Sequence, residues 1–287
     1  MIDFDKAIIC WWSGGVTSAV ACKKAIEMYG LENCRMILLD TKNEHEDTYR
    51  FLKDCEKWYG KEIESLSAIG DSYASIEDVW RKHKSMNVAT GAVCSYKLKR
   101  LVRERWEKSN AFSHQVFGFE FDKKEFNRAK SMVLNHSHTN PIFPLLMFGL
   151  DKGDCINIIQ DAGIEVPAPY KMGLNNNNCM GTGCVQGGIG YWKKIQAEMP
   201  EKFEKMAAME HELTALKGEP VTMLKDQSKA AKEAGNVLVF LEKHEAYPEL
   251  KCLDEMSGRP VKPLQECNGF CGVNDLNERN DTADELA

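Results

Sequence analysis

The chain of 287 residues lacks long hydrophobic runs, and no apolar segment approaches the ~20 residues that a membrane-spanning helix needs. Residues 1–6 carry two aspartates and lack the basic start of a secretion signal, so we expect a cytoplasmic protein that makes no membrane contact. No internal repeat is present, which argues against solenoids and propellers. The net charge of −6 disfavours a protein that binds along duplex nucleic acid, because binding to the phosphate backbone needs positive charge.

Two common phosphate-binding signatures are also missing. The sequence contains no Walker motif, since no Gly-Lys-Ser/Thr follows a glycine at the required spacing. It also lacks the Gly-x-Gly-x-x-Gly spacing of the dinucleotide fingerprint after its first predicted strand. Any nucleotide site in this chain therefore has to be built on a different loop.

The predicted elements alternate between strand and helix. Residues 7–12 (AIICWW) and 35–39 (RMILL) are short apolar runs typical of buried parallel strands. Residues 17–29 and 46–59 have helical spacing, and each helix ends at a glycine. This order favours an α/β fold with a doubly wound parallel sheet. We also predict helices over residues 76–83, 97–108, 154–162 and 191–216, a strand over 115–119 and an extended stretch around 141–146.

The loop Ser13-Gly14-Gly15 joins the first predicted strand to the first helix. Adjacent glycines let the backbone approach an anion closely, and the start of a helix supplies N–H groups that have no intrahelical partner. Ser13, Thr17 and Ser18 add hydroxyl groups. The sequence therefore predicts a cradle for phosphate or pyrophosphate, and the alternative is an ordinary turn capped by serine.

The loop resembles the SGGxxS signature of the PP-loop ATP pyrophosphatase superfamily, and later segments resemble the phosphoadenylyl-sulfate (PAPS) reductase-like family. The resemblance covers roughly residues 7–163 and implies a Rossmann-like PP-loop fold that binds ATP or PAPS. The segments that carry it, in chain order, are Asp40-Thr41, Cys94-Ser95-Tyr96-Lys97, Gly118-Phe119-Glu120 with Glu125 and Arg128, and Pro144-Leu145 with Asp154.

The resemblance also implies where a nucleotide lies. The phosphates are expected at Gly14 and Gly15, and the adenosine is expected near Asp40, which follows a buried strand. An alternative for Asp40 is that it caps the next helix. The remaining residues implied in nucleotide binding are Ser13, Thr17, Ser18, Thr41, Arg100, Gly118 and Arg128.

The expected catalytic residues are Cys94, Lys97 and Glu120. Glu120 stands where the family has an arginine, and we expect it to hold Mg²⁺. Cys94 lies close in sequence to Lys97 and Arg100, and nearby positive charge lowers a thiol pKa and favours the nucleophilic thiolate.

Eleven cysteines are present, and four of them form two close pairs in glycine-rich surroundings. Cys179 and Cys184 have C-x4-C spacing, and Cys267 and Cys271 have C-x3-C spacing. Four thiolates fit a structural zinc ion or a [4Fe–4S] cluster, and the spacing does not decide between them. The alternatives are separate buried thiols or a nucleophilic Cys267. Cysteines expected to be small core residues are Cys10, Cys22, Cys34 and Cys55.

The composition changes at Pro167 to prolines, four consecutive asparagines, glycines and cysteines, which is typical of loops. We therefore expect a PP-loop nucleotide-binding domain over residues 1–166. A cysteine-rich C-terminal region of helix and loop is expected over residues 167–287, with a disordered polar tail.

These patterns predict an enzyme that cleaves ATP at the α-phosphate, releases pyrophosphate and transfers sulfur or another nucleophile to a small-molecule or nucleic-acid acceptor. The first alternative is a PAPS reductase that releases sulfite with a thioredoxin-like reductant. The second is a non-catalytic nucleotide-binding partner in a DNA- or RNA-modification or defence system. A homodimer is expected in each case.

Overall fold

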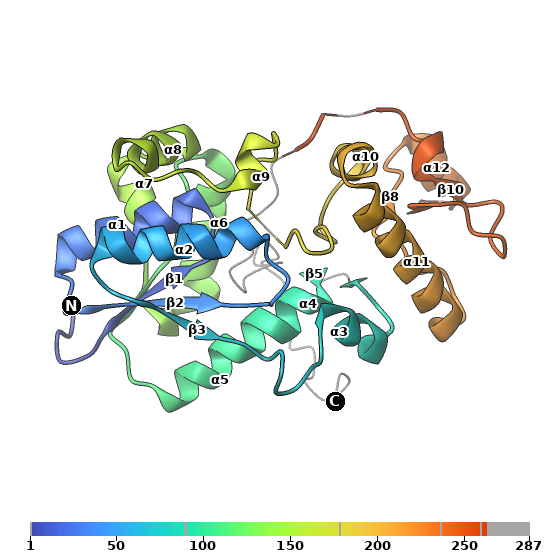
Figure 1. The fold of residues 1–287 in the computed structure, drawn as a ribbon. Coiled ribbons are helices and arrows are strands. Elements are labelled where there is room, and N and C mark those ends of the chain that lie inside the picture. The colour runs from blue at the N-terminus through green and yellow to red at the C-terminus, as the bar shows by residue number, and fades with distance from the viewer. Residues whose placement is uncertain (1, 89–90, 178, 236, 259, 263–287) are drawn as a thin grey trace.

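The computed structural model describes residues 2–88, 91–177, 179–235, 237–258 and 260–262 (Figure 1). Its largest sheet has five strands in the order β3-β2-β1-β6-β7, and every neighbouring pair is parallel. The predicted α/β class with a parallel, Rossmann-like sheet is therefore confirmed. The strands are β1 Ile8–Trp12, β2 Cys34–Leu39, β3 Ile63–Leu66, β6 His114–Val116 and β7 Pro141–Ile142.

The central strand β1 is buried at every position because helices cover both of its faces. Ile8, Cys10 and Trp12 pack with residues of α1, α2 and α8, whereas Ile9 and Trp11 pack with residues of α5 and α6. In Figure 1, α1 and α2 lie above the sheet and α5 lies below it. The helices are α1 Val16–Tyr29, α2 Glu46–Tyr59, α5 Leu101–Ser109, α6 Lys123–Asn135 and α8 Lys152–Asp161.

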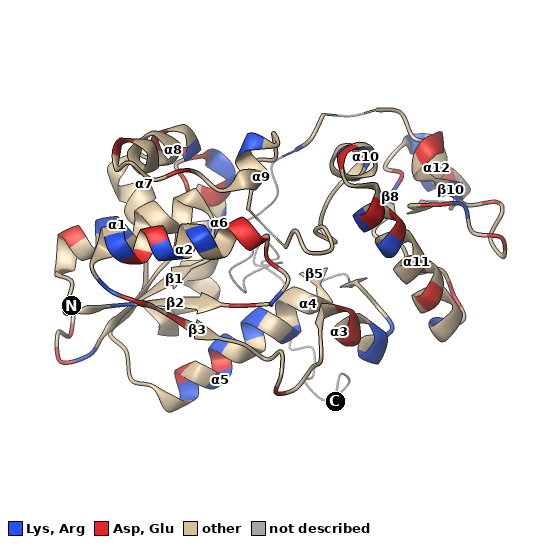
Figure 2. Ribbon diagram, viewed as in Figure 1, with Lys and Arg blue, Asp and Glu red and all other residues tan. Residues whose placement is uncertain are grey.

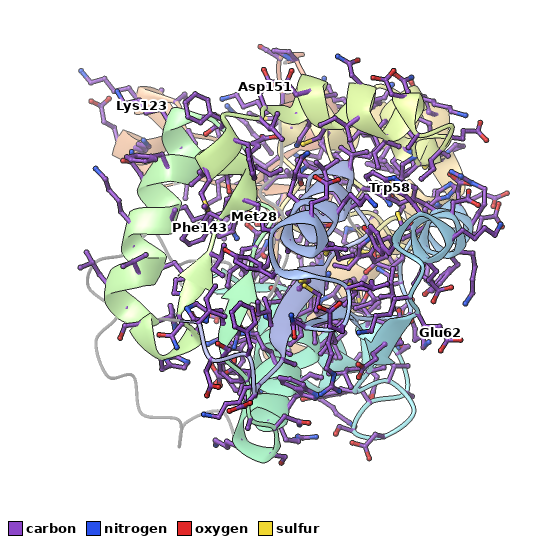
Figure 3. The ribbon with its side chains drawn as sticks, turned by 90° about the vertical axis from the view of Figure 1, so that its left-hand side faces the viewer. Met28, Trp58, Glu62, Lys123, Phe143 and Asp151 are labelled. Atoms are coloured by element: carbon purple, nitrogen blue, oxygen red, sulfur yellow. The ribbon has the colours of Figure 1, made fainter. Side chains whose placement is uncertain are left out.

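The predicted core cysteines Cys10, Cys22, Cys34 and Cys55 are all buried in the α1–α2 side of this core. Figure 3 shows the molecule from the left-hand side of Figure 1, with Met28 of α1 drawn between Trp58 of α2 and Phe143. A thiol behaves as a small apolar group in such a site, so these cysteines need no metal to explain them.

Strand β3 was not predicted, because it is an edge strand without a continuous apolar run. Glu64 and Ser65 of β3 lie on or near the surface, and only Ile63 is buried. The predicted helix over 191–216 is two helices, because Pro200 begins a new helix and cannot continue the previous one. These two helices are α10 Ile189–Glu198 and α11 Pro200–Lys217.

The predicted helix over 97–108 begins with a π-helical turn, η1, and continues as α5. Several short helices and strands make up the other connections between the strands of the main sheet. Helix α3 has its predicted bounds, Ile76–His83. The remaining elements before residue 172 are β4 Asn87–Val88, β5 Gly91–Ala92, α4 Val93–Ser95, η1 Tyr96–Arg100, η2 Ser137–Thr139, α7 Pro144–Phe148 and α9 Ala168–Lys171.

The C-terminal elements lie beyond the carboxyl end of the sheet, on the right in Figure 1. They share one hydrophobic cluster with α3, α4 and η1, which includes Trp80, Leu98, Trp192 and Leu213. In the described residues, no helix is long and apolar enough to cross a membrane. The further elements are α12 Lys229–Ala234, η3 Leu253–Glu255 and the three-stranded sheet β8 Leu224–Lys225, β9 Leu238–Phe240 and β10 Lys251–Cys252.

A buried carboxylate joins α11 to this small sheet. Glu210 is 0% exposed, and its two oxygens accept hydrogen bonds from the backbone N–H groups of Met223 (2.7 Å) and Leu241 (2.6 Å). Burial raises the pKa of Glu210 to about 8, although the two backbone hydrogen bonds lower it in part. The carboxylate therefore connects three segments and titrates well above its ordinary range.

This raised pKa predicts how stability depends on pH. Below the ordinary value of 4.5, the contribution of Glu210 to the free energy of unfolding is fully present, and it is lost as the pH rises through about 8. Urea unfolding at pH 5 and pH 8 measures the difference, and Glu210→Gln reduces it. Glu204→Gln, at an exposed site on the same helix, leaves the difference as in the wild type.

Candidate functional site

The candidate site lies where the strand order changes direction. Strand β1 lies between β2 and β6, so the connections that leave β1 and β6 diverge at the carboxyl edge of the sheet. Ligands of open α/β sheets bind in the crevice at such a position. The loop Ser13-Gly14-Gly15 follows β1, and Gly118 lies two residues after β6. The sheet therefore brings together two segments that are about a hundred residues apart in the sequence.

The backbone of the loop requires glycine at position 14. Gly14 has a φ of +89°, and a Cβ atom there would lie 2.8 Å from Cγ2 of Thr48. The hydroxyl of Ser18 accepts from both the N–H and the hydroxyl of Ser13, each at 3.0 Å, and donates to the carbonyl of Gly15 at 2.9 Å. The two serines of the predicted signature therefore close the loop into a fixed shape.

The second glycine lets β6 approach the first turn of α1. A Cβ atom on Gly118 would lie 2.7 Å from both the backbone N and the Cα of Ser18, and 2.9 Å from the carbonyl carbon of Thr17. Any side chain at position 118 would therefore collide with the start of the helix. The contact places the segment after β6 directly against the N–H groups of this turn.

A buried hydroxyl lies in the same turn. Thr17 is 0% exposed, and its Oγ1 has no hydrogen-bond partner among the described residues. A buried polar atom without a partner costs about 1–3 kcal/mol, so such atoms call for an explanation. A ligand that receives this hydroxyl's hydrogen bond is one explanation.

The loop is covered in this structure. Residues 14–18 are buried, and two downstream side chains contact them. The backbone N–H of Val16 donates to the hydroxyl of Tyr170 at 3.2 Å, and Asn177 donates to the carbonyl of Gly14 at 2.8 Å. Neither Tyr170 nor Asn177 was predicted as a site residue, although the run of four asparagines is a marked feature of the segment. Access to the loop therefore requires these side chains to move.

Asp40 is buried at the end of β2, where it organises its own loop. Its Oδ1 accepts from the N–H of Lys42 (2.8 Å) and from the hydroxyl of Tyr49 (3.0 Å), and its Oδ2 pairs with Lys42 Nζ at 2.7 Å. Burial and the nearby carboxylate of Asp40 raise the pKa of Tyr49. The helix that follows is capped by His45, so capping is not the role of Asp40.

A polar chain runs from the same loop to the π-helical turn. Thr41 donates to Oε1 of Glu44 at 3.0 Å, and Nζ of Lys99 lies 3.7 Å from that oxygen. Thr41 Oγ1 also lies 3.6 Å from the sulfur of Cys179. Glu44 and Lys99 are almost completely buried, and the sequence marked neither of them as a site residue. Lys99 is therefore a buried lysine tied to the β2 loop by an ion pair.

The cysteine loop packs against this edge of the sheet. The N–H of Gly181 donates to the carbonyl of Asn43 at 2.9 Å, and Asn43 Nδ2 donates to Thr182 at 2.8 Å. Cys184 donates its N–H to the hydroxyl of Tyr191 at 3.0 Å. Burial raises the pKa of Tyr191, and the neighbouring Cys184 and Cys179 raise it further.

The metal prediction is only partly covered by the structure. Cys179 and Cys184 are both buried, at 8% exposure each. Over residues 2–262, gaps excepted, no three histidine, cysteine or acidic side chains gather as a metal site would require. The second predicted pair, Cys267 and Cys271, lies outside the described residues.

Two of the predicted catalytic residues, Cys94 and Lys97, belong to the basic segment and lie on α4 and η1. Cys94 is buried on α4, and burial lowers the pKa of Lys97 on η1. Arg100 donates to Glu104 at 2.8 Å, one turn further along. Figure 2 shows basic and acidic residues interspersed along α5. Much of the basic charge in this segment is therefore balanced within the helix.

Glu120 and Arg128 lie beside the connection that follows β6. Glu120 Oε2 lies 3.5 Å from Nζ of Lys152. Arg128 is fully buried, pairs with Glu125 at 3.1 Å and stacks on Phe119 with its guanidinium carbon 4.3 Å from the ring centre. A cation in this position holds α6 against the β6 connection.

Comparison with known proteins adds no relative to this geometry. The chain matches no family model, and a search of curated proteins gives no significant match. The functional assignment therefore depends on the residues at the carboxyl edge of the sheet.

The backbone strain at position 14 gives a testable prediction. Gly14→Ala forces a side chain into a left-handed conformation and against Thr48, so we expect the free energy of unfolding to fall by about 1–2 kcal/mol. Gly188→Ala is the matched control, because Gly188 has a φ of −86° and open space around its Cβ position. Urea unfolding measures the free energy of unfolding of both variants. An equal decrease in the two would contradict the requirement for glycine at position 14.

Proposed function

We propose that this protein is a PP-loop-type enzyme that binds ATP and cleaves it at the α-phosphate. The observation that carries the proposal is the turn at the exit of β1: a glycine loop opens a helix at the switch point, and Gly118, two residues after β6, packs against it. Backbone N–H groups at such a helix start bind phosphate, and the helix dipole adds to the attraction. The buried hydroxyl of Thr17 supplies a further donor.

The residues of the turn fit a polyphosphate. N–H groups in the first turn of an α-helix have no intrahelical acceptor, and the N-cap residue of α1, Gly15, has no side chain to satisfy them. No acidic residue lies in the first turn of α1, so nothing there repels an anion. The turn therefore has a positive dipole end and no acidic side chain of its own, and its Val16 N–H is held by a neutral hydroxyl, that of Tyr170.

The adenosine is proposed to lie along the β2 loop. Asp40 and Tyr49 form a polar pair there, and Thr41 and Glu44 continue it towards Cys179. Carboxylates and hydroxyls at the end of the second strand are suited to ribose hydroxyls and the adenine amino group. In this arrangement the nucleotide spans from the glycine loop to the edge of the cysteine loop.

Cleavage at the α-phosphate is proposed to proceed by attack of an acceptor oxygen on the α-phosphorus. The bond to the β-phosphate breaks, and the products are an adenylated acceptor and pyrophosphate. The thiolate of Cys94 is our candidate for the nucleophile of the second step. Its sulfur bonds to the acceptor atom that carries the adenylate, the bond from that atom to the phosphate oxygen breaks, and AMP leaves. Mg²⁺, where bound, offsets the charge of the phosphates, and Glu120 is the carboxylate that would hold it. Lys97, Arg100 and Arg128 are the proposed basic residues for the phosphate end.

The experiment that tests this function is a pyrophosphate-release assay with ATP, run with and without nucleic-acid and small-molecule acceptors. Acceptor-dependent release of pyrophosphate supports adenylation. Release of sulfite from PAPS with thioredoxin indicates a sulfonucleotide reductase instead. ATP binding without release indicates a nucleotide-binding partner protein.

A substitution of Thr17 separates nucleotide binding from folding. Thr17→Val keeps the shape of the side chain and removes the hydroxyl that lacks a partner, so the nucleotide-free protein is expected to be as stable or more stable. The affinity for ATP is expected to fall about tenfold, because a hydrogen bond to a charged group is lost. Calorimetric titration and urea unfolding measure the two effects.

The matched control is Thr214→Val in α11. Thr214 is also buried, but its hydroxyl accepts from the N–H of Val221 at 3.0 Å. This variant is expected to lose stability and keep its ATP affinity. If Thr17→Val destabilises the protein and binds ATP normally, its hydroxyl has no role at the phosphates.

We also propose that Cys179 and Cys184 are metal ligands, either to zinc or to a [4Fe–4S] cluster. Both lie on one glycine-containing loop that is fixed to the nucleotide edge through Asn43. The absorbance spectrum of anaerobically purified protein tells the two apart, because only the cluster absorbs in the visible. Cys179→Ser is expected to lower the metal content, whereas Cys155→Ser, at a buried thiol of α8, is expected to leave it unchanged. Equal metal content in all three proteins would contradict the assignment.

A further inference from the structure

The hydroxyl of Tyr170 accepts the hydrogen bond of the first N–H group of α1, at the end of the glycine loop. The N–H of Val16 opens α1 and donates to this hydroxyl at 3.2 Å. No side chain of Gly15 caps the helix, and the hydroxyl of Ser18 is engaged within the loop. A single N–H group has one good acceptor position, so Tyr170 and a phosphate oxygen exclude each other there.

Tyr170 is held in this position by its own segment. Helix α9 begins next to Pro167, and the N–H of Ala168 donates to Oδ2 of Asp47 at 2.8 Å. Arg50 pairs with Asp47 and also donates to the carbonyl of Glu165 at 3.0 Å. The tyrosine therefore reaches α1 from a segment anchored on α2.

A second contact covers the other side of the loop. Asn177 donates to the carbonyl of Gly14 at 2.8 Å and to the hydroxyl of Thr48 at 3.0 Å, and it is 2% exposed. Asn175, between Tyr170 and Asn177, accepts at its carbonyl a hydrogen bond from the side chain of Lys152 at 3.0 Å. The chain between Tyr170 and Asn177 therefore crosses the loop and is fixed to the sheet domain at several points.

We propose that Tyr170 is a specificity-determining residue of the nucleotide site, which admits a phosphate to the Val16 N–H only by being displaced. This inference rests on the proposed ATP site. A phosphate oxygen is charged and accepts a stronger hydrogen bond than a neutral hydroxyl, so a polyphosphate displaces the tyrosine and part of its binding energy is spent in doing so. Ligands without phosphate do not meet this barrier.

The test compares Tyr170→Phe with the wild type by calorimetric titration with ATP, inorganic tripolyphosphate and adenosine. Removal of the competing hydroxyl is expected to increase the affinity for ATP and for tripolyphosphate about three- to tenfold, which is the range set by the loss of one neutral hydrogen bond. Adenosine affinity is expected to stay the same. The unfolding temperature of the nucleotide-free variant is expected to fall, because the Val16 N–H loses its partner.

The control is Tyr59→Phe, which removes a hydroxyl that donates to the carbonyl of Ala19 in the same helix at 2.8 Å. It is expected to lower stability without tightening any ligand. If Tyr170 had only a structural role, Tyr170→Phe would behave like Tyr59→Phe. A variant that loses stability but binds polyphosphates more tightly therefore identifies Tyr170 as the competing residue.

Two outcomes overturn the inference in different ways. In the first, the wild type binds ATP while Tyr170→Phe binds polyphosphates only as well as the wild type does, or more weakly. In that case Tyr170 does not compete with phosphate for the Val16 N–H, and the proposed ATP site is unaffected. If neither protein binds ATP or tripolyphosphate, the proposed function itself fails and the inference fails with it.

Discussion

The close approach of two chain segments at the exit of β1 is the constraint on which the site depends. β1 is buried on both faces, so its position is fixed by the packing of helices above and below the sheet. Gly118 of the neighbouring connection then lies within 3 Å of the first turn of α1, measured from where its Cβ would be. Side chains are therefore excluded at that point, and the two segments meet through their backbones.

Much of the sheet domain could be predicted from sequence, because buried parallel strands are continuous apolar runs and glycines end their helices. β3 and the small C-terminal sheet could not, since an exposed edge strand and strands of two or three residues carry no such run. Within the site, the Ser13–Ser18 turn was predictable from local sequence. Tyr170, Asn177 and Lys99 were not, because their roles arise from contacts over long sequence separations or from burial that the sequence does not display.

The segment after Pro167 makes several polar contacts with loops and helices of the sheet domain. It meets the glycine loop through Asn177, the β2 loop through Cys179 and Gly181, and α2 through Ala168. Polar contacts of this kind are short in range and lose their geometry when either side shifts. A shift of the glycine loop is therefore expected to move Asn177, which lies two residues before Cys179 in the same segment.

The order of strands also has a consequence for how the chain assembles. Strand β1 pairs with β2 almost at once, but its other edge waits for β6, about a hundred residues later. Contacts between distant parts of a chain form late, because closing a long loop costs entropy before any contact compensates for it. During synthesis the middle strand therefore leaves the ribosome with one edge unpaired, and the turn at its end gains its contact with Asn177 only after β6 has been made.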